Sequence, residues 1–476
     1  MCLRSLVRGG PLRRSAHAMV DVGRETTADP HVSMGEPDSP VKSGGQRDGG
    51  RLLLRALYVA TWLMMSLFWA FVFIRWLNPS WPHPQALLAS PGQDLGEHLL
   101  DIRLLLEHHN PYVLRPRLND TTPPVTALFV LPLAYLPSPL FEFGSTWASF
   151  AALAASLGML LNRVTPIARG RSLLLASGVL SPLAAATLTP VFSTFTEGQL
   201  HLWIMVMILF DLLVVRESRS GFLVGLATGI IFWPGLFVLA VVHRSRLRGF
   251  VLFLCGGLTA TLAGVIVSPW ASWHYFTHVL PSGEAAQREL TTPLPHGLTR
   301  FGFIGNQTLH GMLARPPLMG TTGGEWFYLF AAVLVGSFGM YVAWRVLDQG
   351  SVVLGYAVIG LTCLVVSPYA WFHHWVWVLL LPFAAIEGWR TRRVLSMVLL
   401  VSLLPFVAGL HLLLNTRAAV FEPGLLSWIR VNLPTLAGIV VLVSAAVSSW
   451  WAVPAIRARH GGAALGRAAK PATTAS

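Results

Sequence analysis

The sequence predicts an all-α polytopic membrane protein, and three observations support this prediction. Of its 476 residues 54% are hydrophobic and only 12% are charged, whereas a soluble domain carries about 25% charged residues. Runs of roughly 18 or more apolar residues recur along most of the chain, and each can cross a hydrocarbon core about 30 Å thick. The net charge of +13 comes from basic residues in short connections between these runs, which indicates topology signals and not nucleic-acid binding. About 10–12 transmembrane helices are expected, two of them re-entrant or split.

Three parts follow one another along the chain. Residues 1–50 are rich in Gly, Ser, Pro and mixed charge, lack the apolar core of a signal peptide and are predicted to form a disordered cytoplasmic leader. The membrane domain is expected over 51–455, with its first span at about 56–76, and a basic cytoplasmic tail over 456–476. Cys255 and Cys363 lie in apolar runs and Cys2 lies in the leader. The cysteines therefore indicate neither a disulfide framework nor a metal site.

Basic clusters assign the connections to the two sides of the membrane. Arginines near residues 51, 163–171, 216–219, 244–248 and 390–393 should all be cytoplasmic. They can share one side only if each of the apolar runs 123–140 and 221–243 enters and leaves the membrane on the same side. Prolines interrupt the first run, and Gly229, Pro234 and Gly235 interrupt the second, as re-entrant or split segments require. The chain is thus predicted to be a multi-pass plasma-membrane protein with both termini cytoplasmic, and residues 77–122, 269–325 and SPYAWFHH are expected on the far side.

The first of these far-side segments contains GQDLGEHLLDIRLLLEHHNPYV. Asp94, Glu97, His98 and Asp101 have helical spacing beside leucines, which predicts an interfacial helix with one wet face and one lipid face. Asp94 has two interpretations. It can be a first-turn residue favoured by the helix dipole, or a partly desolvated general base that takes a proton from a hydroxyl group.

His373 and His374 stand among three tryptophans at the mouth of a span. A histidine there can belong to an interfacial aromatic belt. Neighbouring side chains on a helix point about 100° apart, however, so at least one imidazole should face the protein interior. There it can donate to a phosphate oxygen or act as an acid.

The second long far-side segment carries FIGNQTLHGMLARPP, with Asn306, Gln307, Thr308, His310 and Arg315 in one run. This run can be a polar loop with a capping role, or it can bind sugar hydroxyls or a lipid phosphate. The chain has neither a phosphate-binding glycine-rich loop nor a dinucleotide fingerprint. An activated donor, if used, is therefore expected to be embedded in the membrane and reached from the outer face.

Several motifs in order resemble one family. They are D-L-x(16)-Y from Asp94 to Tyr112, TTPPVTALFVLPLAYLP from Thr121, EGQLHLWIMVMILFDLL from Glu197, and NQTLHGMLAR from Asn306 followed by SPYAWFHHWVW. Together they are similar to actinobacterial membrane glycosyltransferases of the GT-C class, family 87, which are polyprenyl-phosphate-mannose-dependent α-mannosyltransferases. The resemblance covers residues 56 to 452.

This resemblance implies a multispanning fold with an outer-face cavity, interfacial helices on that face and a lipid-monophosphate sugar donor. It implies that Asp94 is the catalytic base and that His373 and His374 lie by the donor phosphate and the acceptor. Residues in or near the family motifs are expected to bind the donor phosphate (His310 and Arg315) or other parts of the substrates (Tyr112, Gln199, His201, Asn306, Gln307 and Trp371).

Two positions depart from the family pattern. Ile231 stands near the place where the family commonly has Lys, and His201 stands where Asn usually follows the GQ pair. A lost cation can alter phosphate binding or sugar choice, so a divergent member with another substrate and an inactive member both stay open.

The leading hypothesis is inverting transfer of a sugar, most simply mannose, from a polyprenyl phosphate donor to a glycolipid or lipoglycan acceptor at the extracytoplasmic face. No cofactor and no metal are expected, because the leaving group has no diphosphate to clamp. Partners are these two substrates and membrane lipids, and no nucleic acid. The alternatives are an arabinofuranosyltransferase using polyprenyl phosphate arabinose, and a transporter or lipid flippase, which usually shows internal repeats that this chain lacks.

Overall fold

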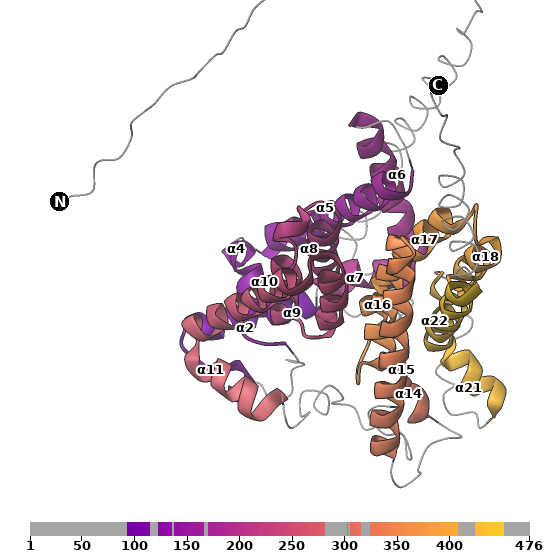
Figure 1. The fold of residues 1–476 in the computed structure, drawn as a ribbon. Coiled ribbons are helices and arrows are strands. Elements are labelled where there is room, and N and C mark those ends of the chain that lie inside the picture. The colour runs from indigo at the N-terminus through magenta and orange to yellow at the C-terminus, as the bar shows by residue number, and fades with distance from the viewer. Residues whose placement is uncertain are drawn as a thin grey trace, which may run out of the picture. The chain divides into compact units, whose positions relative to one another are not determined.

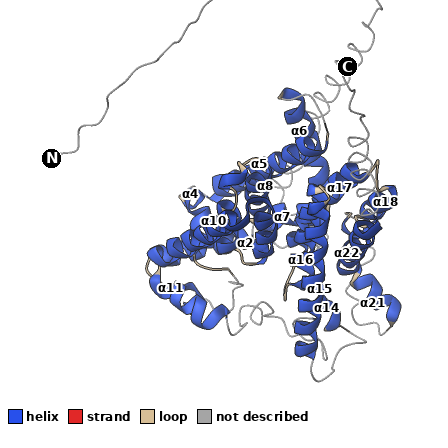
Figure 2. Cartoon of the chain, in the orientation of Figure 1, coloured by secondary structure: helices blue, strands red, loops and turns tan. Residues whose placement is uncertain are grey.

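A computed structural model describes residues 93–114, 122–135, 138–165, 170–280, 302, 305–315, 324–407 and 424–451. The chain divides into two units, Met1–Arg51 and Leu52–Ser476, and every described residue belongs to the second. These residues form helices joined by short connections, and no strand occurs among them (Figure 2). The all-α prediction is confirmed. The predicted leader, first span and C-terminal tail lie outside the described residues, so the three-part division stays a prediction.

The described elements follow one another along the chain as Figure 1 labels them. The first half contains α2 (Gln93–Leu106), α3 (Pro111–Leu114), α4 (Val125–Ala134), α5 (Ser138–Val164), α6 (Arg171–Thr187), α7 (Thr189–Glu197), α8 (His201–Leu213), η1 (Glu217–Arg219), α9 (Phe222–Ile230), η2 (Trp233–Phe237), α10 (Val238–Val267), α11 (Pro269–His274) and the π-helical turn η3 (Tyr275–Val279). The second half contains α14 (Leu309–Leu313), α15 (Gly324–Asp348), α16 (Val352–Val366), η5 (Phe372–Leu379), α17 (Leu380–Gly388), α18 (Arg393–Val401), η6 (Leu404–Phe406), α21 (Leu425–Val431) and α22 (Leu433–Trp451).

Several described helices are long and apolar enough to cross a membrane. Four qualify singly: Gly144–Val164, Trp233–Val267 (which changes direction at Arg246), Trp326–Asp348 and Leu433–Trp450. The helices α7 and α8 qualify together as one span bent by 117°. These segments establish a polytopic membrane protein.

The run at 221–243 reverses direction, as its glycines and proline predict. Gly221 packs against Gly249, Gly225 against Phe253 and Gly229 against Gly257. Residue numbers therefore increase in the same direction along α9 and along the second part of α10, so these two stretches run parallel. The chain between them has to turn back twice, first at the break after Ile230 and then at Arg246, whose φ is 52°.

The run at 123–140 contains a helix that is too short to cross the bilayer. With ten residues and a rise of 1.5 Å per residue, α4 is about 15 Å long, half of the hydrocarbon thickness. The Thr126 hydroxyl donates to the Ile230 carbonyl over 2.8 Å, so α4 meets the broken end of α9. The two segments predicted to re-enter thus contact each other.

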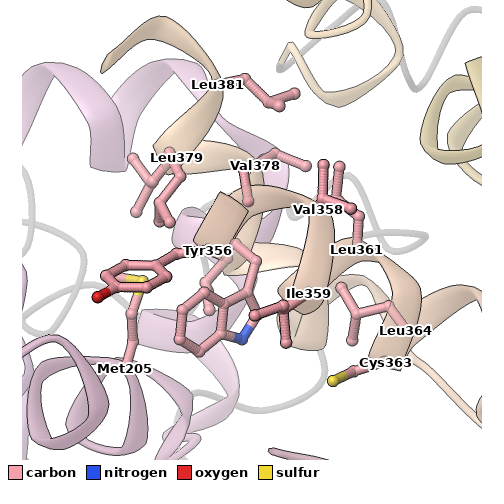
Figure 3. Close-up of a cluster of buried hydrophobic side chains, with 14 of the residues drawn as sticks. Met205, Tyr356, Val358, Ile359, Leu361, Cys363, Leu364, Val378, Leu379 and Leu381 are labelled. Carbon is pink, nitrogen blue, oxygen red and sulfur yellow. The ribbon is translucent and has the colours of Figure 1, made fainter. Parts of the chain in front are cut away.

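The core surrounds α16, in which residues 353–365 are all buried. Figure 3 shows Tyr356, Ile359 and Cys363 among aliphatic side chains from neighbouring helices, including Met205 and Leu379. The segment after α16 folds back onto it, and the Trp377 ring covers Gly360, where an added Cβ would lie 2.9 Å from the ring. This packing holds η5, which carries the two adjacent histidines, against α16.

Candidate active site

The break between α7 and α8 positions two side chains of the candidate site. Glu197 ends α7, and His201 begins α8. Gly198 between them has φ 74°, a left-handed conformation that glycine adopts without strain and that often ends a helix. Irregular backbone inside a membrane protein is typical of substrate and ion sites.

Three imidazoles meet at this break. The ring centroids of His201 and His374 lie 4.2 Å apart, those of His201 and His373 lie 4.9 Å apart, and those of the adjacent pair lie 4.6 Å apart. His201 is 2% exposed, and its two ring nitrogens have no hydrogen-bond partner among the described residues. The Trp233 ring, from the break between α9 and α10, stacks on His201. We call His201, His373 and His374 the histidine cluster.

Hydrogen bonds fix the orientation of two rings of the cluster. His373 Nδ1 donates to the Glu197 carboxylate. His374 Nδ1 accepts the Trp371 amide N–H over 2.8 Å, and the Trp371 carbonyl accepts the His374 amide over 3.0 Å. Since its Nδ1 accepts a hydrogen bond, the neutral His374 ring carries its hydrogen on Nε2.

The cluster has the separation, but not the hydrogen positions, of a three-histidine metal site. Each residue offers one ring nitrogen, and these atoms lie within 4.8 Å of one another. A metal would need a lone pair on His374 Nε2, whereas the Trp371 amide makes that atom a donor. The arrangement is better suited to donate hydrogen bonds to an anion such as phosphate.

The helix of Asp94 packs near this cluster. An electrostatic interaction joins His98, on α2, to His201, and burial lowers the pKa of His98 to about 4. Asp94 precedes His98 by four residues, so the two positions share one helical face. The Asp94 side chain itself lies outside the described ones.

The predicted helix is present as α2 at 93–106 and its interfacial location stays a prediction, but one detail of its predicted pattern is wrong. Asp101 was expected on the wet face and is only 5% exposed. It lies beside the buried Ile102 and Leu105 on the face packed against the protein, since α2 contacts α4 and α7.

The run at 306–315 holds the connection that leads to the histidines. The Asn306 carboxamide accepts the Ala370 amide N–H over 3.2 Å and donates to the Pro368 carbonyl over 3.1 Å. The Gln307 amide N–H donates to the Ala370 carbonyl over 2.9 Å. Its side chain donates to the Val431 carbonyl over 3.1 Å.

Arg315 and Thr308 complete this network. The Arg315 guanidinium donates to the carbonyls of Gly302 and Asn306 and to the Asn432 side chain. Burial lowers its pKa to about 9, so it keeps its charge at neutral pH. Thr308 caps α14 by accepting the Gly311 amide N–H over 3.0 Å. These contacts favour the capping alternative for the run, and its predicted substrate contacts stay predictions.

The remaining predicted residues have different surroundings. Gln199 lines a water-sized cavity at the α7–α8 break, together with Thr194 and Trp203. The Tyr112 hydroxyl donates to the Thr122 carbonyl over 2.8 Å. His310 stacks on Tyr328 with ring centroids 4.0 Å apart.

Two contributors were not predicted as site residues. Glu197 was noted only as the start of a motif, although a carboxylate inside a membrane segment is by itself a signal of function. Trp233 lies inside the break expected from Gly229, Pro234 and Gly235, and an aromatic residue at a helix break gives no such signal.

Fold and site together define a polytopic membrane enzyme with titratable groups at helix breaks. The model of Glycosyltransferase family 87 matches residues 121–368, which is more than half of the chain. The chain belongs to glycosyltransferase family 87, as the motif resemblance indicates. Asp94, His373 and His374 lie outside the matched range.

Curated relatives agree with this family. A polyprenol-phosphate-mannose-dependent alpha-(1-2)-phosphatidylinositol mannoside mannosyltransferase of Mycobacterium tuberculosis is 29% identical over 366 residues, 73% of this chain and 80% of the relative. A protein of the same name from Mycolicibacterium smegmatis is 27% identical over 58% of this chain and 63% of its own length. A pentamannoside mannosyltransferase of Mycobacterium tuberculosis is 27% identical over 57% of this chain and 59% of its own length. No solved structure matches the chain.

Proposed function

We propose that this glycosyltransferase transfers mannose from polyprenol-phosphate-mannose to a hydroxyl of a phosphatidylinositol mannoside glycolipid. The relatives that match the chain carry this donor and this acceptor class in their names. The observation that carries the residue-level proposal is the histidine cluster beside Glu197, together with the electrostatic interaction between His201 and His98, which follows position 94 by four residues on α2.

The chemistry is a single displacement with inversion at the anomeric carbon. Asp94 accepts the proton of the acceptor hydroxyl while the oxygen of that hydroxyl attacks C1 of the β-linked donor. The bond from C1 to the phosphate oxygen breaks, its electron pair leaves with the polyprenyl phosphate, and the new linkage is α. No other group enters or leaves, so the reaction balances.

The histidine cluster suits the phosphate that leaves. His374 Nε2 carries a hydrogen because Nδ1 accepts the Trp371 amide, and His201 is buried without hydrogen-bond partners among the described residues. Donors fixed in advance toward developing charge stabilise a transition state without reorganisation. The Asn306 and Gln307 bonds to residues 368–370 hold the backbone just before these rings.

The position of the basic residues supports an extracytoplasmic site. Arg216 follows α8, and the Arg244 side chain donates to the Val215 carbonyl over 2.8 Å, so both lie at the end of α8 opposite His201. The helix has 13 residues and is about 20 Å long. Because basic connections favour the cytoplasm, the cluster belongs to the other side of the membrane.

A transfer assay with purified protein tests this proposal. Polyprenyl phosphate carrying either mannose or arabinose is incubated with a panel of phosphatidylinositol mannosides, and products are identified by mass. We expect the mass of one added hexose with the mannose donor only. Transfer of a pentose would show that the donor sugar is arabinose and not mannose, and no transfer from either donor would refute the proposal.

A further inference from the structure

Glu197 occupies a position that costs stability in two ways. It is the last residue of α7, and a carboxylate at a helix C-terminus meets the negative end of the helix dipole. It also lies in a bent apolar segment able to cross the membrane, where ionisable side chains are costly and usually functional. Helix stability therefore does not explain why a carboxylate is placed here.

The carboxylate meets one ring of the histidine cluster. Its Oε2 accepts the hydrogen of His373 Nδ1, and the side chains are 27% and 9% exposed, respectively. From the same helix, the Thr194 hydroxyl, which donates to the Pro190 carbonyl over 2.8 Å, lies 3.4 Å from the His373 carbonyl. The end of α7 thus meets both the ring and the backbone of His373.

The surroundings of His373 show what the carboxylate does electrostatically. The titratable rings that face it are those of His201 and His374, at 4.9 and 4.6 Å, and His98 lies beyond His201. Burial and neighbouring imidazoles both oppose a positive charge on a ring. Among the described residues, Glu197 is the carboxylate that accepts the hydrogen of His373 Nδ1, and a negative charge at this position favours the imidazolium form.

We propose that Glu197 is a positioning residue that orients His373 and keeps its ring cationic while the sugar phosphate leaves. The carboxylate fixes Nδ1–H and leaves Nε2 as the atom that titrates and meets an anion. This role rests on the proposed function, because it requires a phosphate leaving group. Glu197 touches neither substrate nor reacting atoms and acts through His373.

Two substitutions separate charge from shape. Glu197→Gln keeps the side-chain length and an acceptor oxygen but removes the charge, whereas Glu197→Asp keeps the charge on a shorter side chain. The exposed Glu217, on η1, gives the matched control Glu217→Gln. For all proteins, kcat and KM for the donor are measured from pH 5 to pH 9, together with the melting temperature.

Glu197→Gln should lower kcat and kcat/KM together, by roughly 10- to 150-fold, the value of a hydrogen bond to a charged group. The sign of the pH effect follows from the charge: without the carboxylate the imidazolium loses its proton more easily. The alkaline limb of the rate profile should therefore move to lower pH, by about one unit or more. Glu197→Asp should keep the alkaline limb at the wild-type pH, and Glu217→Gln should change neither the kinetic constants nor the pH profile.

Two results would overturn the inference. One is a Glu197→Gln protein with the wild-type rate, and the other is a lowered rate with an unmoved alkaline limb, which a purely structural role predicts. If Glu197→Gln does not fold, Glu197→Asp decides, because an alkaline limb displaced despite the retained charge contradicts the proposal. Absence of transfer by the wild type would refute the proposed function instead, so the two failures are distinguishable.

Discussion

The clearest separation between catalysis and packing is expected at His374. Its Nδ1 accepts the Trp371 amide N–H, and the opposite side of the ring presents Nε2–H. His374→Asn places an amide oxygen near the position of Nδ1 and removes the group at Nε2. The bond to the backbone should survive while the donor to phosphate is lost. A hydrogen bond to a charged group is worth about 1.5–3 kcal/mol, so kcat should fall roughly 10- to 150-fold at a nearly unchanged melting temperature.

The complementary substitution is His374→Gln, whose amide nitrogen reaches the position of Nε2. It should retain more of the rate than Asn, but it leaves the Trp371 N–H without its acceptor at a cost of about 1–3 kcal/mol. The assay is the initial rate of mannosyl transfer beside a melting curve in detergent. Wild-type rates in both variants would indicate that His374 is part of an interfacial aromatic belt and has no catalytic role. Rate losses that follow the stability losses would make its role structural.

Three further changes test the base, the helix packing and the buried histidine. Asp94→Asn should lower kcat about 10²–10⁴-fold. The control Glu107→Gln, which changes an exposed carboxylate just beyond α2, should leave kcat unchanged. A helix-cap role predicts no loss for Asp94→Asn, because Asn caps nearly as well as Asp. Gly225→Ala would place a Cβ 1.9 Å from a backbone carbonyl of α10 and should lower the free energy of unfolding by about 1–3 kcal/mol, which is measured as a lower melting temperature. In the control Gly96→Ala the added Cβ meets open space, so this variant should melt at or above the wild-type temperature. Burial lowers the pKa of His310 from 6.5 to about 4, so the unfolded chain binds the proton first and the protein loses stability as the pH falls from 6.5 toward 4. This loss of stability should be smaller in His310→Phe. An equal loss in the wild type and the variant would contradict the prediction.

The features that could be predicted from the sequence are local ones. The break near Gly229 and Pro234 follows from the inability of these residues to continue a helix, and the structure places it between α9 and α10. Similarly, two adjacent histidines on a helical turn cannot both face lipid, and the structure brings both into one cluster.

The features that were missed depend on contacts between distant residues. Glu197 and His373 are 176 residues apart, so no local pattern could pair them. Asp101 fits the polar face of an amphipathic helix by spacing, yet tertiary packing buries it. A buried arginine in a polar run is compatible with phosphate binding, and only the tertiary structure shows that carbonyls and Asn432 surround Arg315.

The stereochemistry of the product tests the central claim most directly. Polyprenyl phosphate with β-linked mannose, labelled with ¹³C at C1, is incubated with the wild-type protein and a phosphatidylinositol mannoside. The anomeric configuration of the labelled residue in the glycolipid is then read by NMR. We predict a single α-linked mannose, because one base and one leaving phosphate allow one displacement. A β-linked product, or label recovered only as free mannose or unchanged donor, would contradict the account.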